Sequence, residues 1–327
     1  MKILAIRFAR LGDVLLLLPS LRSLKERFPD SRLVLLTGHR CAPIAELCPF
    51  IDEVIAVDRI AMRDGPFWSA FASMNRLVRN LRRRHFDVVI DFHSFRETNL
   101  LTWLSRAPIR IGMKRHRAAY WAFCFNQPPV IEDKTIHVSA MFQRIVESLP
   151  SNVQPRLPAD GRTDPVLRIQ EVRPRERKLV LYVDAPVPDR IWPPERFAAV
   201  ADFAIESLNA EVFVVAGTGV ELTAAVRNAS RYREHITACT ELTLHQLATL
   251  IASARLLVSN DTGPMHIGPA AGVPTLGLFS VGYPEHFRPI GPGDRYLRQN
   301  PIGKIEVRDV IANVEEMWLI ADQGLRR

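Results

Sequence analysis

Cysteine is scarce in this sequence, and none of it lies in a metal-binding pattern. The four cysteines, Cys41, Cys48, Cys124 and Cys239, are neither closely paired nor flanked by histidines at ligand spacing. We interpret them as reduced and mostly buried thiols. A Cys41–Cys48 disulfide is the less favoured alternative, and no bound metal is expected.

Long apolar runs are also missing. The N-terminal strand-like segment is interrupted by Arg7 and Arg10, and the apolar run 14–21 is far too short to cross a bilayer. Neither a secretory signal nor a membrane-spanning helix fits this pattern. We therefore expect a cytoplasmic protein.

Aromatic residues make up only 8% of the chain and are not interleaved with its basic residues. This argues against a groove for single-stranded nucleic acid. The net charge of +8 is unevenly placed, because residues 1–160 carry an excess of nine positive charges and the remainder an excess of one negative charge. An anionic acceptor, an anionic lipid surface or nucleic acid would meet the first half. For the run ending at His85 alone, a solvated helix end is the favoured interpretation.

The first half alternates short apolar runs with amphipathic stretches. Runs at 2–8, 32–37, 53–57 and 87–92 predict buried parallel strands. Leu17, Leu21, Leu24 and Phe28 recur at helical spacing between the first two runs, and Pro19 either starts or kinks that helix. This order predicts an α/β fold with a doubly wound sheet.

A proline-rich stretch, 150–177, is the expected linker between domains 1–160 and 161–327. The second half repeats the alternation, with strands expected at 178–183, 211–216, 235–238, 256–259 and 275–279 and helices at 194–208, 221–228, 244–252 and 265–271. A last amphipathic helix, 307–321, is expected to lean back on the first domain. No repeat of fixed period is present.

Ligands of such folds bind beyond the carboxyl ends of the strands, across a cleft that two linked sheets would share. Asp13 follows the first strand and Gly12. It suits a helix start, where a carboxylate meets free backbone amides, and it equally suits a general base that deprotonates an acceptor hydroxyl. The segment alone leaves both interpretations open.

The stretch "SNDTGPMHIGPAAGVPTLGLF" at 259–279 is the strongest signal. A buried strand ends in Asn260 and Asp261, and Thr262 and Gly263 lead into a helix that carries His266. A glycine turn that opens a helix favours a diphosphate. Asp261 would bind a hydroxyl, and His266 is assigned to the anion site in preference to a core position.

Two further loops follow strands of the second half. Gly217-Thr218-Gly219 leads to Glu221, which could accept hydrogen bonds from a base or ribose. Arg190 offers a cation for a phosphate ahead of Trp192 and Pro193. Taken alone, a surface arginine and a core tryptophan would be the preferred interpretation.

With these residues the chain resembles glycosyltransferase family 9, the ADP-heptose:lipopolysaccharide heptosyltransferases. The resemblance runs through "RLGDVLLLLPSLRSLKERFP", "FDVVIDFHS", "RIG", "RIWPPERF" and the 259–279 stretch. It implies a GT-B fold of two Rossmann-like doubly wound domains that face a central cleft. It also implies that the first domain binds the acceptor, that the second binds the donor, and that transfer inverts the anomeric centre without a metal.

The resemblance also implies roles for individual residues. Asp13 corresponds to the catalytic base, Asp261, Thr262, Gly263 and His266 to the donor loop, and Glu221 to the acidic residue that contacts the nucleoside. Arg190 replaces a lysine that neutralises the donor phosphates, which exchanges an ammonium for a planar guanidinium. Ala185, Pro186 and the segment "FSVGYPEHF" depart from the family pattern, and these departures bear on the donor's identity.

We therefore expect transfer of a heptose or related sugar from a nucleotide diphosphate, with ADP-heptose as donor, to a lipopolysaccharide inner-core acceptor. No separate cofactor is expected. The candidate acceptor-binding residues are Arg10, Arg79, Arg82, Arg83 and Arg84, the acceptor is an anionic glycolipid at the inner membrane, and oligomeric state is left open. The rivals are a GT-B epimerase acting on a UDP-sugar and a non-catalytic basic protein that binds membranes or nucleic acid.

Overall fold

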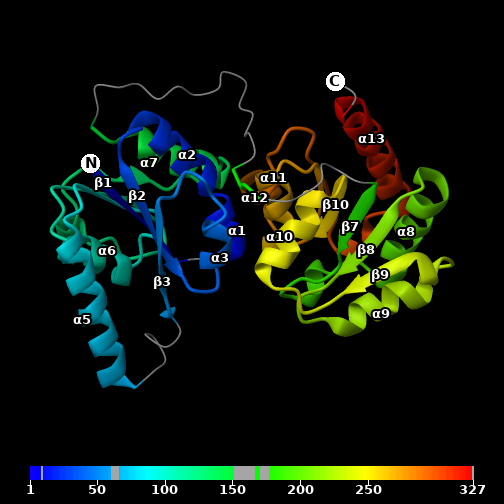
Figure 1. Ribbon diagram of the computed structural model, residues 1–327, viewed down its shortest axis with the longest axis horizontal. Helices are drawn as coiled ribbons and strands as arrows, with labels where there is room; N and C mark the ends of the chain where they lie inside the picture. The colour runs from blue at the N-terminus through cyan, green and yellow to red at the C-terminus, as the bar shows by residue number, and fades with distance from the viewer. Residues whose placement is uncertain (9, 60–65, 151–165, 170–176, 326–327) are drawn as a thin grey trace. The chain divides into compact units, whose positions relative to one another are not determined.

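A computed structural model describes residues 1–8, 10–59, 66–150, 166–169 and 177–325 (Figure 1). The chain forms two compact units, Met1–Ala159 and Asp160–Arg327. Most of the proline-rich stretch predicted as a linker, at 151–165 and 170–176, lies outside the described residues.

The first unit is a parallel sheet with helices between its strands, as predicted. In spatial order its strands are β3, β2, β1, β4, β5 and β6. The strands are β1 (Lys2–Arg7), β2 (Arg32–Gly38), β3 (Glu53–Val57), β4 (Val88–Asp91), β5 (Ile109–Lys114) and β6 (Val130–Ile131). The helices are α1 (Leu11–Leu15), α2 (Leu18–Arg27), α3 (Ala42–Ala45), α5 (Phe67–Arg84), α6 (Arg96–Leu104) and α7 (Val138–Glu147), with a 3-10 turn, η1 (Ala122–Cys124).

Proline chemistry decides how the first crossover is built. Pro19 lies in the first turn of α2, where its missing N–H costs no helical hydrogen bond, so it starts a helix and does not kink one. Leu17, Leu21 and Leu24 are fully buried, whereas Phe28 is partly exposed after the end of α2. The segment 11–28 is therefore two helices, a short α1 that follows β1 and a longer α2 that covers the sheet.

The second unit repeats the plan with strand order β12, β11, β10, β7, β8 and β9, all parallel. Its strands are β7 (Lys178–Tyr182), β8 (Glu211–Val215), β9 (Ile236–Cys239), β10 (Leu256–Asn260), β11 (Thr275–Phe279) and β12 (Arg295–Arg298). Its helices are α8 (Pro194–Leu208), α9 (Val220–Ala229), α10 (Leu244–Ser253), α11 (Ile267–Ala270), α12 (Pro284–Phe287) and α13 (Val307–Leu325). Short 3-10 turns are η2 (Pro188–Arg190), η3 (Arg233–His235), η4 (Gly263–His266) and η5 (Ile302–Lys304).

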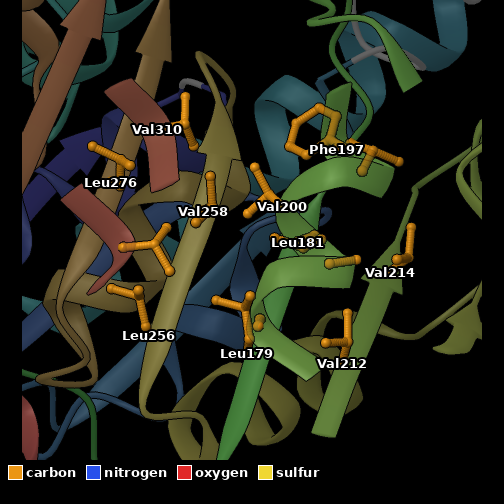
Figure 2. Packing of buried hydrophobic residues seen from close by; sticks show 14 of the residues in the cluster. Leu179, Leu181, Phe197, Val200, Val212, Val214, Leu256, Val258, Leu276 and Val310 are labelled. Carbon is orange, nitrogen blue, oxygen red and sulfur yellow. The ribbon is translucent and has the colours of Figure 1, made fainter. Parts of the chain in front are cut away.

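The second unit's core lies between its sheet and the helices that cover it. Figure 2 shows Leu181 and Val258 of neighbouring strands beside Phe197 and Val200 of α8. The final helix, α13, adds Val310, Val314, Met317 and Trp318 to the same core. One apolar face of this helix is thus buried within the second unit, and the expectation that the helix leans back on the first domain stays a prediction.

The prediction of a helix at 265–271 is only partly correct. The chain forms the 3-10 turn η4 and then the one-turn helix α11, with prolines at 264 and 269 that cannot donate helical hydrogen bonds. Cys41, Cys48 and Cys124 are buried, as predicted, and Cys239 is partly buried. Among the described residues, no helix has the length and apolar character needed to span a membrane.

Candidate active site

Each unit has one point where the strand order reverses direction along the chain. In the first unit it lies between β1 and β4, and in the second it lies between β7 and β10. Open α/β sheets bind ligands beyond the carboxyl ends of the strands at such a point. Asp13 follows β1, Arg190 follows β7 and Asp261 follows β10, so sequence-predicted residues flank both points.

Asp13 lies in the first turn of α1 and forms an ion pair with a buried arginine. The guanidinium of Arg7 donates to Asp13 Oδ1 at 2.7 Å, and the Asp13 side chain is 29% exposed. Asp13 is not the N-cap of this helix, since that position belongs to Arg10. The carboxylate is thus anchored through one oxygen and remains partly accessible.

Arg7 is held on three sides. Besides Asp13, it donates to the Phe92 carbonyl at 2.7 Å, and its guanidinium lies 4.8 Å from the centre of the Phe142 ring. Burial lowers the pKa of Arg7, and the nearby Asp13 carboxylate opposes that shift. Sequence analysis treated Arg7 only as an interruption of an apolar run, although a charge at the end of a buried strand was the available signal.

A histidine that sequence analysis quoted only within a motif lies after β4 at the same edge. His93 is 4% exposed, it packs beside Phe8 and Phe95, and neither ring nitrogen has a hydrogen-bond partner within the described part of the chain. Burial and the cations Arg7, Arg59 and Arg115 lower the pKa of His93 to about 2, so the imidazole is neutral. The Arg115 guanidinium donates to the His93 carbonyl at 3.2 Å.

The arginines of α5 lie at the opposite edge of this sheet. Arg84 forms an ion pair with Glu53 at the start of β3, and its carbonyl accepts from Lys2 at the start of β1. Five residues of β1, at a rise of roughly 3.3 Å each, put about 17 Å between this edge and Arg7. The structure therefore does not bring Arg79, Arg82, Arg83 and Arg84 together with Asp13, whereas Arg10 is exposed and directly precedes α1.

In the second unit, two of the predicted donor residues pair with each other. The Arg190 guanidinium lies 3.1 Å from Asp261 Oδ2, and it also approaches the Asp261 carbonyl at 3.5 Å. Asp261 is 7% exposed, and its burial raises the pKa of its carboxyl while Arg190 opposes the rise. A Cβ atom on Gly282 would lie 2.2 Å from Asp261 Oδ2, so only glycine permits this approach.

Asn260 ties the two loops at this switch point together. Its amide donates to the Val183 carbonyl at 2.8 Å and accepts from the Trp192 N–H at 3.1 Å. Trp192 is fully buried and donates to Ile305, which makes it a core residue. The Ser280 hydroxyl after β11 donates to the Asp189 carbonyl, so a third loop joins the pair.

The loop from Thr262 to His266 begins with the 3-10 turn η4, and His266 is buried at its end. The N–H groups of Thr262 and Gly263 precede the hydrogen bonds of that turn, so the turn does not use them. The predicted contribution of a helix dipole is smaller than expected, because a one-turn helix aligns few peptide units. Backbone amides and Arg190 are the groups available to an anion here.

The glycine loop after β8 already holds a carboxylate. Asp184 Oδ2 accepts from the N–H groups of Gly217, Thr218 and Gly219 at 3.1–3.3 Å. These amides are therefore not available to a phosphate. Glu221 is exposed in the first turn of α9, just beyond this loop. Sequence analysis missed Asp184, whose signal was a single acidic residue directly after a buried strand.

Within the described ranges, His, Cys, Asp and Glu side chains do not form a group of three suited to holding a metal ion. Metal independence stays a prediction, because an arrangement of side chains does not report on the reaction. The roles assigned to the candidate residues stay predictions as well.

Comparison with known proteins places this geometry in context. The sequence profile of Glycosyltransferase family 9 (heptosyltransferase) matches residues 74–310, more than half of the chain. Lipopolysaccharide heptosyltransferase 3 of Escherichia coli is 23% identical over 286 residues, which cover 85% of this chain and 83% of that protein.

Solved structures share the fold over nearly the whole chain. The E. coli heptosyltransferase WaaC with ADP matches with a TM-score of 0.79 at 18% identity, covering 97% of this chain and all (100%) of that one. A family 9 glycosyl transferase from Veillonella parvula DSM 2008 matches with a TM-score of 0.77 at 23% identity, covering 97% of each chain. The predicted GT-B class, with two parallel six-stranded sheets, is confirmed.

Proposed function

Because this chain belongs to glycosyltransferase family 9, we propose that it moves a heptose or related sugar from a nucleotide diphosphate donor to a lipopolysaccharide inner-core acceptor. ADP-heptose is the proposed donor, supported by the solved relatives described with ADP and with an ADP-heptose analogue. The observation that carries the proposal is the Asp13 carboxylate, anchored by Arg7 through one oxygen at a switch point.

The proposed step is a single displacement with inversion. Asp13 takes the proton of the acceptor hydroxyl as that oxygen bonds to the anomeric carbon, and the bond from that carbon to the diphosphate breaks. Arg7 acts as a positioning residue, since its bonds to Asp13 and to Phe92 fix the direction of the carboxylate. His93, which follows β4 at the same edge of the sheet, is neutral and adds no charge there.

Donor binding is assigned to the second unit. Arg190 pairs with Asp261, and a donor diphosphate is a stronger partner for its planar guanidinium. Negative charge grows on the diphosphate as it leaves, so Arg190 and the amides of Thr262 and Gly263 stabilise the transition state most. His266 belongs to the same loop, Asp261 is assigned to a sugar or ribose hydroxyl, and Glu221 to the nucleoside.

Acceptor binding is assigned to the first unit, whose sequence carries the excess of positive charge. An anionic inner-core glycolipid is the proposed acceptor, met at the cytoplasmic face of the inner membrane. Arg10 lies nearest to Asp13 along the chain and is exposed, so it is the member of the predicted set best placed to meet the reacting sugar.

A test combines donor binding with product analysis. Asp13→Asn should lower transfer from ADP-heptose by roughly a hundredfold or more while leaving the donor dissociation constant within about twofold. Asp30→Asn, at an exposed carboxylate, is the matched control and should retain activity. Retained transfer by Asp13→Asn would remove the assigned base, and an epimerised sugar from donor incubated alone would favour the epimerase instead.

A further inference from the structure

The first unit has a basic hollow at the edge of its sheet opposite to Asp13. Arg82, Trp103, Leu104, Arg106 and Arg110 line an open hollow of about 290 Å³. They come from the end of α5, the end of α6 and the start of β5. All three places lie at the amino edge of the parallel sheet, about 17 Å from Arg7 along β1 at roughly 3.3 Å per residue.

Two of the three guanidinium groups of this hollow donate to backbone carbonyls, and none of the three forms an ion pair with a carboxylate of the described residues. Arg82 donates through Nε to the Leu104 carbonyl at 2.8 Å. Arg110 donates to the carbonyls of Cys124 and Ala107 at 3.0 and 2.6 Å. These bonds use one nitrogen of Arg82 and two of Arg110, while Arg106 is exposed on a left-handed backbone with φ of 60°. Like charges that share one hollow repel, and a bound anion would offset that repulsion.

Exposed aromatic rings stand beside the arginines. Trp103 is 45% exposed and Phe123 is 63% exposed, and their rings meet edge to face at 6.1 Å. Trp121, which directly precedes η1, stacks on Phe123 at 6.0 Å, so the three rings form one group. Tryptophan is enriched at membrane–water interfaces, where one end of its side chain is apolar and the other is wet.

We propose that this hollow binds the phosphate of an anionic lipid headgroup, with Trp103 and Phe123 entering the membrane interface. Unpaired arginine nitrogens match phosphate oxygens, and guanidinium forms paired hydrogen bonds with them. The rings favour a lipid over free phosphate, because they add apolar contact that a free ion cannot use. The proposal names the residues that make the membrane contact of the proposed function, and it does not depend on the transfer chemistry.

The test uses the full chain and vesicles that contain phosphatidylglycerol, compared with vesicles of phosphatidylcholine alone. The double variant Arg82→Gln with Arg106→Gln should lower partition onto the anionic vesicles by about thirtyfold, the scale expected for two cations lost near an anionic surface at about 1 kcal/mol each. The matched control, Arg79→Gln with Arg83→Gln, removes the same charge from α5 outside the hollow and should lower partition less than threefold. Thermal unfolding of each variant confirms that both remain folded.

Two further measurements identify the ligand, and a third tests independence from transfer. Trp103→Ala should weaken vesicle binding and leave titration with inorganic phosphate unchanged. Transfer to a deacylated, soluble acceptor should be unchanged in the single variant Arg106→Gln, which separates this proposal from the proposed function.

Equal losses in the two double variants would show diffuse attraction and overturn the assignment to the hollow. Inorganic phosphate that binds as tightly as the vesicles, or a DNA oligonucleotide that binds in preference to them, would also overturn it.

Discussion

Replacing Arg7 by methionine tests whether this buried cation acts through Asp13. Methionine keeps a long unbranched side chain but removes the donors to Asp13 and to the Phe92 carbonyl. The Arg7 side chain is only 3% exposed, so water cannot restore these bonds fully. Losing charge-assisted hydrogen bonds of this kind should cost about 2 to 4 kcal/mol of unfolding free energy.

The catalytic effect follows from the freedom that Asp13 gains. A misplacement of the carboxylate by about 1 Å lowers the rate on the order of a hundredfold, which is equivalent to about 2.7 kcal/mol of activation free energy. We therefore expect kcat to fall by roughly a hundredfold in Arg7→Met, with the donor KM nearly unchanged because the proposed donor residues lie in the other unit. Arg7→Lys should recover part of the rate, since one ammonium can serve one of the two acceptors.

The assay is a double-mutant cycle on kcat, measured at saturating acceptor with thermal unfolding as a check on folding. In the Asp13→Asn background the residual rate does not use the base, so Arg7→Met should change it less than about threefold. If Arg7→Met lowered the rate by the same factor in both backgrounds, Arg7 would be a structural residue and the positioning argument would be wrong.

Three other predictions address the donor, the metal and pH. Arg190→Gln should lower kcat/KM for the donor by roughly a hundredfold and Arg190→Lys by less, because the guanidinium is proposed to meet the growing charge on the phosphates. An Arg190→Gln variant with an unchanged kcat/KM in steady-state kinetics would contradict this role. Activity should survive excess EDTA, and a loss restored by Mg²⁺ or Mn²⁺ would contradict metal independence. Burial raises the pKa of Asp91 to about 6, so the folded chain retains there a proton that the unfolded chain releases near pH 4. The stabilisation from this protonated carboxyl is fully present below pH 4 and should be lost as pH rises through 6. In urea unfolding, the free energy of unfolding should fall by about 3 kcal/mol relative to that of Asp91→Asn. Parallel pH profiles of the unfolding free energy for the two proteins would refute this prediction.

Strand prediction succeeded where burial leaves a near-continuous apolar run. The strands β2, β8 and β11 are of this kind, and their predicted bounds differ from those observed by at most one residue. Three strands were missed: β5 carries Arg110 and Lys114, β12 places a tyrosine and a leucine between two arginines at the sheet edge, and β6 has only two residues. Such short or charged strands are fixed by pairing with a neighbour, which single-sequence periodicity does not contain.

The positions of the candidate residues at strand ends were easier to predict than the groups that they contact. Asp13, Arg190 and Asp261 all follow strands, and strand ends were recognisable from the sequence. Which groups meet is a tertiary property: Arg7 is six residues from Asp13, but the Asp184 carboxylate reaches amides more than thirty residues away. The acceptor role given to the α5 arginines rested on net charge, which does not tell one edge of a sheet from the other.

The amide of Asn260 has a consequence for exchanging donor specificity by design. This amide bonds to both ends of the loop after β7, at Val183 and at Trp192, and Ser280 after β11 donates to the same loop. Three segments therefore share one set of hydrogen bonds. A loop transplanted alone from another transferase would arrive without its bonding partners and leave a buried amide unsatisfied. Chimeras should therefore exchange all three segments as a block, and libraries should vary them jointly.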